Sequence, residues 1–186
     1  MVLATCTVGR EPRAGVDFLP LMVNYQEKFY ATGSVGGVKF QRREGKPPVD
    51  KRLLGRMIDR GIRPMRPRNL RRDIQVMLTI LSYDFENEHD IIAANAGSLA
   101  VAISGCPFEK PLGTVRVGRI NNEFVLNPSP EMRKESDIDL IVTTSETNVV
   151  MVEGETKEVS KEVFWNAGEF GKKSGQEIVM FIKKIQ

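Results

Sequence analysis

The residues best suited to chemistry in this chain are arginines, and residues 39–72 are unusually dense in them. That stretch holds thirteen Lys or Arg against three acids, a net charge of +10, whereas the whole 186-residue chain carries +3. One segment therefore places a concentrated positive field on an otherwise mildly acidic body. This charge pattern is typical of a site that binds a polyanion.

The middle of this stretch is predicted to form an amphipathic helix, with Asp50 as its N-cap. At 3.6 residues per turn, the spacing i, i+4, i+8, i+11 puts four arginines on one face: Arg52, Arg56, Arg60 and Arg63. Asp59 lies on the same face and can hold one or two of them in position. The apolar residues expected to face the core are Leu53, Leu54, Met57 and Ile58. Guanidiniums grip phosphate oxygens in a fixed fork, although a solvated basic face remains the alternative.

A second candidate group precedes this helix, in a glycine-containing loop. Gly33, Gly36 and Gly37 lead into Phe40, Arg42 and Arg43. Glycine freedom, an aromatic ring and paired arginines suit stacking on an unpaired base while the backbone is held. The alternative is a surface loop whose phenylalanine packs into the body.

Other residue types exclude several kinds of site. His89 is the only histidine, so catalytic sites with two histidines and His-rich metal sites are excluded, and we expect His89 on the surface or at a helix start. Asp137 and Asp139 resemble a metal pair, but two strand carboxylates without a third ligand are more often surface charge, and no metal site is predicted. Cys6 and Cys106 show no partner spacing, which indicates core residues in a reducing compartment, the cytoplasm.

Length and composition predict one soluble domain spanning residues 1–186, with 41% hydrophobic and 27% charged residues and neither a signal peptide nor a membrane-crossing run. The opening strand starts almost at the first residue, so we expect a truncated N-terminus. The pattern predicts strands at 2–9, 18–30, 74–83, 113–120, 123–127, 139–144 and 149–153, and helices at 90–104, 130–134 and 160–186. Hairpins and helices in blocks favour an α+β or mixed α/β fold.

Several segments, taken in order, carry a family likeness. PLMVNYQEKFYATG, FQRREGKP, GRMIDRGIRPMRP and NAGSLAVAISGCPF are followed by GTVRVGRINNEFVLNPS and SDIDLIVTTSETNVVMVEGETKE. Through almost its whole length the chain resembles the first of the two RNase PH-like halves of the polynucleotide phosphorylase family. The resemblance implies a mixed sheet packed against helices, as in the second domain of ribosomal protein S5. It also implies that the second half and the RNA-binding domains are absent from this chain.

The resemblance further implies a reaction and its partners. Inorganic phosphate attacks the last phosphodiester at the 3′ end of single-stranded RNA and releases a nucleoside diphosphate, reversibly, in RNA degradation. The family's enzymes form rings of six such halves, a trimer of two-half chains, and use a divalent metal such as Mg²⁺, bound mainly by the second half. Bringing two negative groups together calls for such a set of cations.

Site residues carry over from the family's motifs by resemblance. The Arg pair of the R-x-I-D-R segment matches Arg56 and Arg60, with Arg63 following, and implies an anion site. The RNA-gripping loop matches Phe40, Arg42 and Arg43, with Lys46 as a basic helper. Gln41 replaces the family's second phenylalanine, which implies weaker stacking. Asp139 matches the aspartate of the family's catalytic Asp-x-Lys step, but Ile141 stands where the lysine belongs.

Two functions stay open at this stage. The first is part of a phosphorolytic exoribonuclease, inactive alone without its second half. The second is a non-catalytic RNase PH-like ring subunit that binds RNA. The missing lysine fits both, because in either case the catalytic centre lies on another segment of polypeptide.

Overall fold

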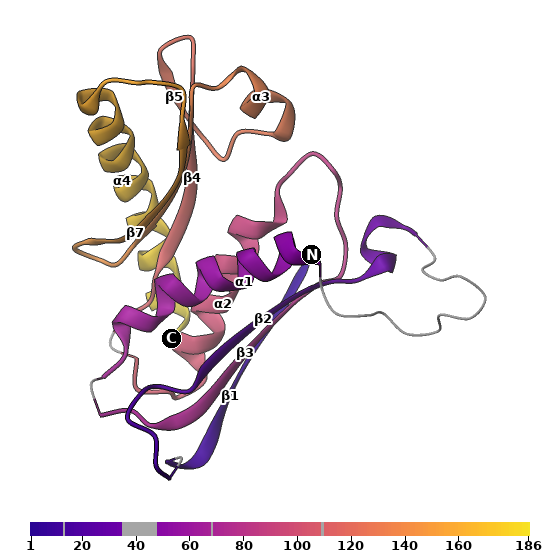
Figure 1. Cartoon of the computed structure of the whole chain (residues 1–186), viewed down its shortest axis with the longest axis vertical. Helices are drawn as coiled ribbons and strands as arrows, with labels where there is room; N and C mark the ends of the chain where they lie inside the picture. Colours follow the sequence, from indigo (N-terminus) through magenta and orange to yellow (C-terminus); the bar gives the residue numbers. More distant parts are fainter. Residues whose placement is uncertain (13, 35–47, 68, 109) are drawn as a thin grey trace.

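The computed structural model describes residues 1–12, 14–34, 48–67, 69–108 and 110–186, and combines two β-sheets with helices (Figure 1). This confirms the expected mixed fold. Its elements in chain order are β1 (Val2–Pro12), β2 (Leu21–Glu27), the 3-10 helix η1 (Phe29–Thr32), α1 (Val49–Ile62), the 3-10 helix η2 (Arg63–Met65), β3 (Arg72–Ile80), α2 (His89–Ile103), β4 (Gly113–Ile120), β5 (Glu123–Leu126), α3 (Pro130–Glu135), β6 (Ile138–Thr144), β7 (Val149–Thr156) and α4 (Lys161–Ile185).

The first sheet has the strand order β1-β3-β2. β1 runs antiparallel to β3, whereas β2 runs parallel to it. Parallel neighbours need a crossover connection, and α1 lies within that connection between β2 and β3. β3 is the central strand, as its nearly continuous apolar run predicts. The arginine-bearing helix is therefore tied at both ends to neighbouring strands of one sheet.

The second sheet is antiparallel throughout, in the order β5-β4-β6-β7. Asn121 and Asn122 both have positive φ, 50° and 65°, as a type I′ turn between β4 and β5 requires. α4 packs along β4 and β6 (Figure 1). α2 contacts β4 as well as β1 and β3, so this helix joins the two sheets.

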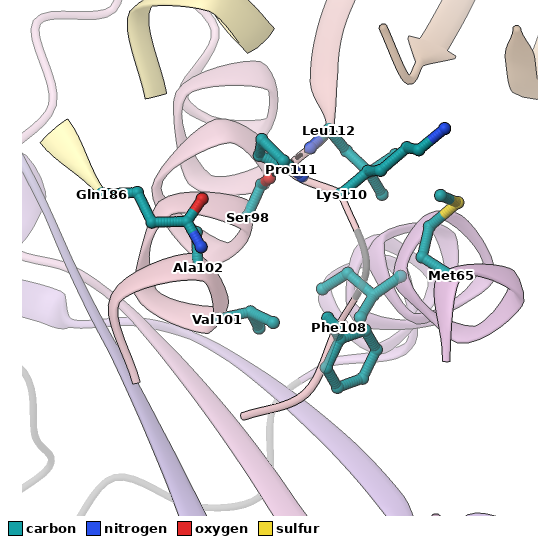
Figure 2. A pocket seen from close by; sticks show the side chains of 10 residues that line it. Met65, Ser98, Val101, Ala102, Phe108, Lys110, Pro111, Leu112 and Gln186 are labelled. Atoms are coloured by element: carbon teal, nitrogen blue, oxygen red, sulfur yellow. Dashed lines mark hydrogen bonds between the residues drawn. The ribbon is translucent and has the colours of Figure 1, made fainter. Parts of the chain in front are cut away.

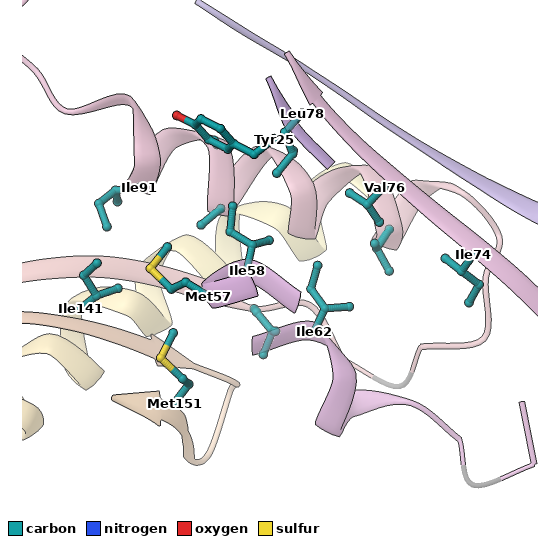
Figure 3. Packing of buried hydrophobic residues seen from close by; sticks show 14 of the residues in the cluster. Tyr25, Met57, Ile58, Ile62, Ile74, Val76, Leu78, Ile91, Ile141 and Met151 are labelled. Carbon is teal, nitrogen blue, oxygen red and sulfur yellow. The ribbon is translucent and has the colours of Figure 1, made fainter. Parts of the chain in front are cut away.

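The main hydrophobic core lies between the first sheet, α1 and α2, and reaches the second sheet. Figure 3 shows Met57, Ile58 and Ile62 of α1 among side chains of β3 on one side and Ile141 and Met151 on the other. A second cluster, which includes Val117, Leu140 and Val142, packs against α4. β6 is thus buried on both faces, and alternate side chains on it serve different cores.

Glycines allow the closest approaches between elements. A Cβ added to Gly97 of α2 would lie 3.3 Å from the Leu78 side chain of β3, so a small residue there lets α2 pack closely on the sheet. A tighter contact joins β4 to α4. There, a Cβ on Gly113 would lie 2.0 Å from the carbonyl oxygen of Gly175, so no side chain fits at that crossing.

The structure also corrects several sequence-based expectations. The predicted strand at 18–30 is shorter: β2 covers Leu21–Glu27, and η1 replaces its end. Pro48, not Asp50, is the N-cap of α1, and Asp50 falls in the first turn. Leu53 is 55% exposed rather than in the core. Met57 and Ile58 are buried as expected, and Gly55, Gly61 and Ile62 complete the buried side of α1.

Candidate anion-binding site

The arginine face of α1, defined here as Arg52, Arg56 and Arg60, is open to solvent. All three residues are exposed, while Met57 and Ile58 on the buried side retain only 4% exposure each. Within the described part of the chain, Arg52 and Arg56 make no ion pair. Guanidinium groups stay protonated at any physiological pH. The helix is therefore anchored by its apolar side and presents unneutralised charge on the other.

Arg60 has a weak partner on the neighbouring sheet. Its Nη2 lies 3.4 Å from the Glu153 carboxylate of β7, and the two side chains are 58% and 40% exposed. Such an exposed, long ion pair contributes little and is screened by salt. An incoming phosphate can therefore displace Glu153 from Arg60 at small cost.

Arg63 is engaged within the protein, unlike its neighbours on the helix. Its Nε and Nη2 donate to the Asp59 carboxylate at 2.9 and 2.7 Å. Its Nη1 and Nη2 also donate to the carbonyl oxygens of Leu19 and Leu21, at 3.2 and 3.3 Å. The prediction that Asp59 holds an arginine is confirmed. In this arrangement Arg63 fixes the end of α1 against the start of β2.

The predicted RNA-contacting residues cannot be placed in this structure. Phe40, Arg42, Arg43 and Lys46 lie outside the described residues. The described chain ends at Ser34 after η1 and resumes at Pro48, the N-cap of α1. In the sequence these residues immediately precede the end of α1 that carries Arg52.

Sequence reasoning missed a second group of charges, at the start of α2. This closed cluster consists of Glu88, Asp90, Arg116, Arg133 and Asp139. Arg116 donates from Nη1 to Asp139 at 2.6 Å and from Nη2 to Asp90. Burial lowers the pKa of Arg116, but the two aspartates outweigh that effect and raise the pKa above its usual value. The available signal was an arginine inside the apolar strand TVRVG, because a buried arginine requires a carboxylate partner.

Asp139 is neither a metal ligand nor an exposed surface charge in this cluster. Its carboxylate accepts hydrogen bonds from Arg133 Nε at 2.8 Å and Nη2 at 2.5 Å, in addition to the one from Arg116. Asp137 lies 3.4 Å from Arg119. Among the described residues, no three His, Cys, Asp or Glu side chains are grouped so as to hold a metal. The Mg²⁺ that the resemblance implies therefore does not fit these carboxylates, because arginines already occupy them.

His89 is buried at the start of α2, so the expectation of a surface position is wrong and the expectation of a helix start is confirmed. Its Nδ1 lies 3.1 Å from Tyr25 Oη and its Nε2 lies 3.2 Å from Glu27. Glu27 also pairs with Lys51 of α1 at 2.5 Å. Burial raises the pKa of Glu27, but Lys51 and His89 outweigh it and hold that pKa below its usual value. This chain of contacts ties α1 to α2.

Three cavities lined by described residues have no residue of the arginine face in their lining. A pocket between the end of α1, α2 and the C-terminus has about 10 Å³ of free space, enough for roughly one water molecule. Figure 2 shows its largely apolar lining, with Met65, Val101, Ala102 and Phe108 around it. None of the helices in the described part of the chain has both the length and the apolar composition needed to span a bilayer.

Comparison with known families divides the chain at the boundary between its two sheets. Residues 1–107, which contain the first sheet with α1 and α2, match the model of the 3′ exoribonuclease family, domain 1. Residues 110–174, which contain the second sheet, match that of the 3′ exoribonuclease family, domain 2.

Similar curated proteins are bacterial polyribonucleotide nucleotidyltransferases. That of Methylorubrum extorquens (strain PA1) is 46% identical over 184 residues, which is 99% of this chain and 25% of the relative. That of Brucella anthropi is 45% identical over 185 residues, 100% of this chain and 26% of the relative. The chain spans about a quarter of the length of the curated relatives it matches.

A solved structure with the same fold is the crystal structure of rice (Oryza sativa) Rrp46. It superimposes with a TM-score of 0.75 at 14% sequence identity and covers 98% of this chain and 81% of that chain. At this identity the likeness concerns the fold alone.

Proposed function

Because this chain belongs to the 3′ exoribonuclease family, we propose that it is the first RNase PH-like half of a phosphorolytic 3′-to-5′ exoribonuclease, a polyribonucleotide nucleotidyltransferase. In the proposed reaction an oxygen of inorganic phosphate attacks the last phosphodiester of an RNA. A new P–O bond forms, the bond to the preceding ribose 3′ oxygen breaks, and a nucleoside diphosphate leaves. The reverse reaction extends RNA.

The observation that carries this proposal is the open arginine face of α1. Both reactants are anions, so their approach requires preorganised cations. Arg56 and Arg60 lie one helical turn apart on an anchored helix, and Arg56 makes no ion pair with any other described residue. We assign phosphate binding to these two residues. Arg63, with its contacts to Asp59 and two carbonyl groups, positions the helix rather than meeting the anion directly.

The remaining partners follow from the same assignment. Phe40, Arg42, Arg43 and Lys46 guide single-stranded RNA toward the reacting end. A second RNase PH-like half supplies the catalytic carboxylates and lysine and binds Mg²⁺, while this chain contributes no metal ligand. Two-half chains assemble as a trimeric ring that degrades mRNA in the cytoplasm.

One observation favours the alternative of a non-catalytic, RNA-binding ring subunit. Asp139, which the resemblance aligns with a catalytic aspartate, is held by two arginines and is not available for chemistry. The same observation predicts that the chain alone releases no nucleoside diphosphate from polyadenylate and phosphate. Adding a second half discriminates between the two functions. Phosphorolysis appears if this chain is the enzyme half, and it stays absent if the chain is a non-catalytic subunit.

The decisive experiment measures phosphorolysis in the two-half enzyme with arginine variants. Losing a preorganised charged donor commonly costs about a hundred- to a thousandfold in rate. We expect Arg60→Ala to lower phosphorolysis by about that factor while binding of long RNA changes little. Arg60→Lys should restore only part of the rate, because a point charge does not reproduce the guanidinium fork.

A matched control removes the same charge elsewhere. Lys173→Ala/Lys184→Ala deletes two exposed cations from α4 and should leave the rate unchanged, whereas Arg56→Ala/Arg60→Ala should abolish most of it. If the two double variants behave alike, the arginine face is only a solvated surface. Separately, Arg42→Ala/Arg43→Ala should weaken the binding of long RNA. The slope of log K against log salt concentration should become shallower by about 0.7 per lost phosphate contact.

A further inference from the structure

The closed cluster at the start of α2 alternates in charge from the interior to the rim. Asp90 of α2 pairs with Arg116 of β4, Arg116 with Asp139 of β6, and Asp139 with Arg133 of α3. Arg133 then reaches Glu88, the N-cap residue of α2, at 2.7 Å. Three carboxylates therefore share two guanidiniums.

Exposure increases along this series. The side chains of Asp90 and Arg116 are 2% and 7% exposed, that of Asp139 is 16% exposed, and those of Glu88 and Arg133 are 26% and 29% exposed. Arg116 thus neutralises the buried end, whereas Arg133 stands where solvent reaches the cluster. Removing Arg133 would leave a net surplus of two negative charges beside that opening.

The contacts of Arg133 resemble those of a bridging cation. Its guanidinium donates hydrogen bonds to two carboxylates that come from different parts of the chain, at distances of 2.5 to 2.8 Å. Carboxylates gathered in this way repel one another unless a cation lies between them. Mg²⁺, Mn²⁺ and Ca²⁺ prefer the same ligands, oxygen atoms from Asp and Glu.

We propose that Arg133 is a built-in cation: its guanidinium occupies the place where a divalent metal ion would bridge Glu88 and Asp139. The chain then holds α2, α3 and β6 together without a metal. This inference does not rest on the proposed enzymatic function, because it concerns metal binding and folding of this chain alone.

The test is a gain of metal binding on removal of the guanidinium. Arg133→Ala in the full chain should bind Mn²⁺ with a Kd of roughly 10⁻⁴–10⁻³ M, as weak oxygen-ligand sites do. Electron paramagnetic resonance measures the concentration of free Mn²⁺, and the bound Mn²⁺ is the difference from the total. The parent chain should leave all Mn²⁺ free. Without metal the variant should melt below the parent, and excess Mn²⁺ should recover part of the lost Tm.

Three further variants make the outcome specific. Arg133→Gln removes the charge but keeps a shorter polar side chain with hydrogen-bonding groups, so it tests the same gain if the alanine variant folds poorly. Arg133→Ala/Asp139→Asn should lose the acquired Mn²⁺ site. Lys134→Ala removes a neighbouring exposed cation from α3 and should gain no binding. The proposal is overturned if the parent binds Mn²⁺ through Asp139, or if the folded Arg133 variants bind no more than Lys134→Ala.

Discussion

The arginine face of α1 and the closed cluster at α2 use the same cationic group in opposite ways. Arg52 and Arg56 point to solvent with no ion pair in the described structure, whereas Arg116 is 6% exposed and touches two aspartates. The first group lies in the stretch of densest positive charge, and the second lies outside it. The number of charges in a segment therefore does not decide their role. That role is decided by the carboxylates that the fold brings to each guanidinium.

The largest effect should come from opening the closed cluster. Arg116→Ala leaves Asp90 and Asp139 without their shared cation, and breaking a buried ion pair costs about 3–5 kcal/mol. Arg56→Ala should change the free energy of unfolding by no more than about 0.5 kcal/mol, as exposed substitutions do. Urea unfolding of both variants measures the difference. Equal costs would remove the distinction between the two arginine groups.

The next effect concerns the anchoring that makes the arginine face a fixed surface. Ile58→Ala creates a cavity at a position that is 4% exposed and should cost about 2–5 kcal/mol. Leu53→Ala, one helical turn from Arg56 but 55% exposed, should cost about 0.5 kcal/mol or less. Thermal and urea unfolding report both values. A large cost for Leu53→Ala would mean that α1 buries the side predicted from its sequence.

A smaller effect should depend on pH. The pKa of Glu27 in the folded protein lies below its ordinary value of 4.5, because Lys51 and His89 outweigh the effect of its burial. Its ionised form therefore adds stability above pH 4.5, and this contribution disappears as pH falls through the lower, folded pKa. Glu27→Gln should cost about 1 kcal/mol at neutral pH and progressively less in acid.

The matched control for that titration is Glu177→Gln on α4, an exposed position outside the ion pairs of the described residues. Its free energy of unfolding should follow that of the parent at every pH. If the difference in free energy of unfolding between Glu27→Gln and the parent grows toward acid pH, the pKa of Glu27 is not lowered by folding.

The smallest effect should come from Arg60 and Glu153. A double-mutant cycle with Arg60→Ala and Glu153→Gln should give a coupling of about 0.2–1 kcal/mol, as for exposed pairs. Because Glu153 is the ion-pair partner of Arg60, Glu153→Gln alone should strengthen binding of inorganic phosphate, the anion that we propose Arg60 binds, at low salt. A coupling above about 2 kcal/mol would place Arg60 with the structural arginines instead.

The arginine face could be predicted because helical periodicity is a local property. Its buried side was predicted less well, because Gly55 and Gly61 carry no apolar side chain to count. A Cβ on Gly55 would lie 3.2 Å from the Val23 carbonyl oxygen, so the backbone of α1 itself approaches β2 there. This approach turns Leu53 outward. The predicted end of the strand at 18–30 was wrong, because the apolar spacing continues into η1.

The closed cluster lay beyond prediction because its pairs are distant in sequence. Arg116 meets Asp90 and Asp139 across 26 and 23 residues, and Arg133 meets Glu88 across 45. No spacing rule joins such positions before the sheets are placed. Asp139 itself can be picked out from the sequence, but Gly118 is the residue of β4 directly opposite it. Arg116 stands two residues away on β4 and reaches Asp139 diagonally.

The contact between Gly113 and Gly175 has a consequence for sequence variation. A methyl group at 113 would overlap the carbonyl oxygen of Gly175, and one at 175 would lie 2.6 Å from Thr144 Oγ1. The two positions therefore cannot drift independently toward larger residues, as exposed helix positions can. A lineage that lost either glycine would have to move the whole of α4 away from β4, so substitutions at these two sites should arise only together with changes along the helix.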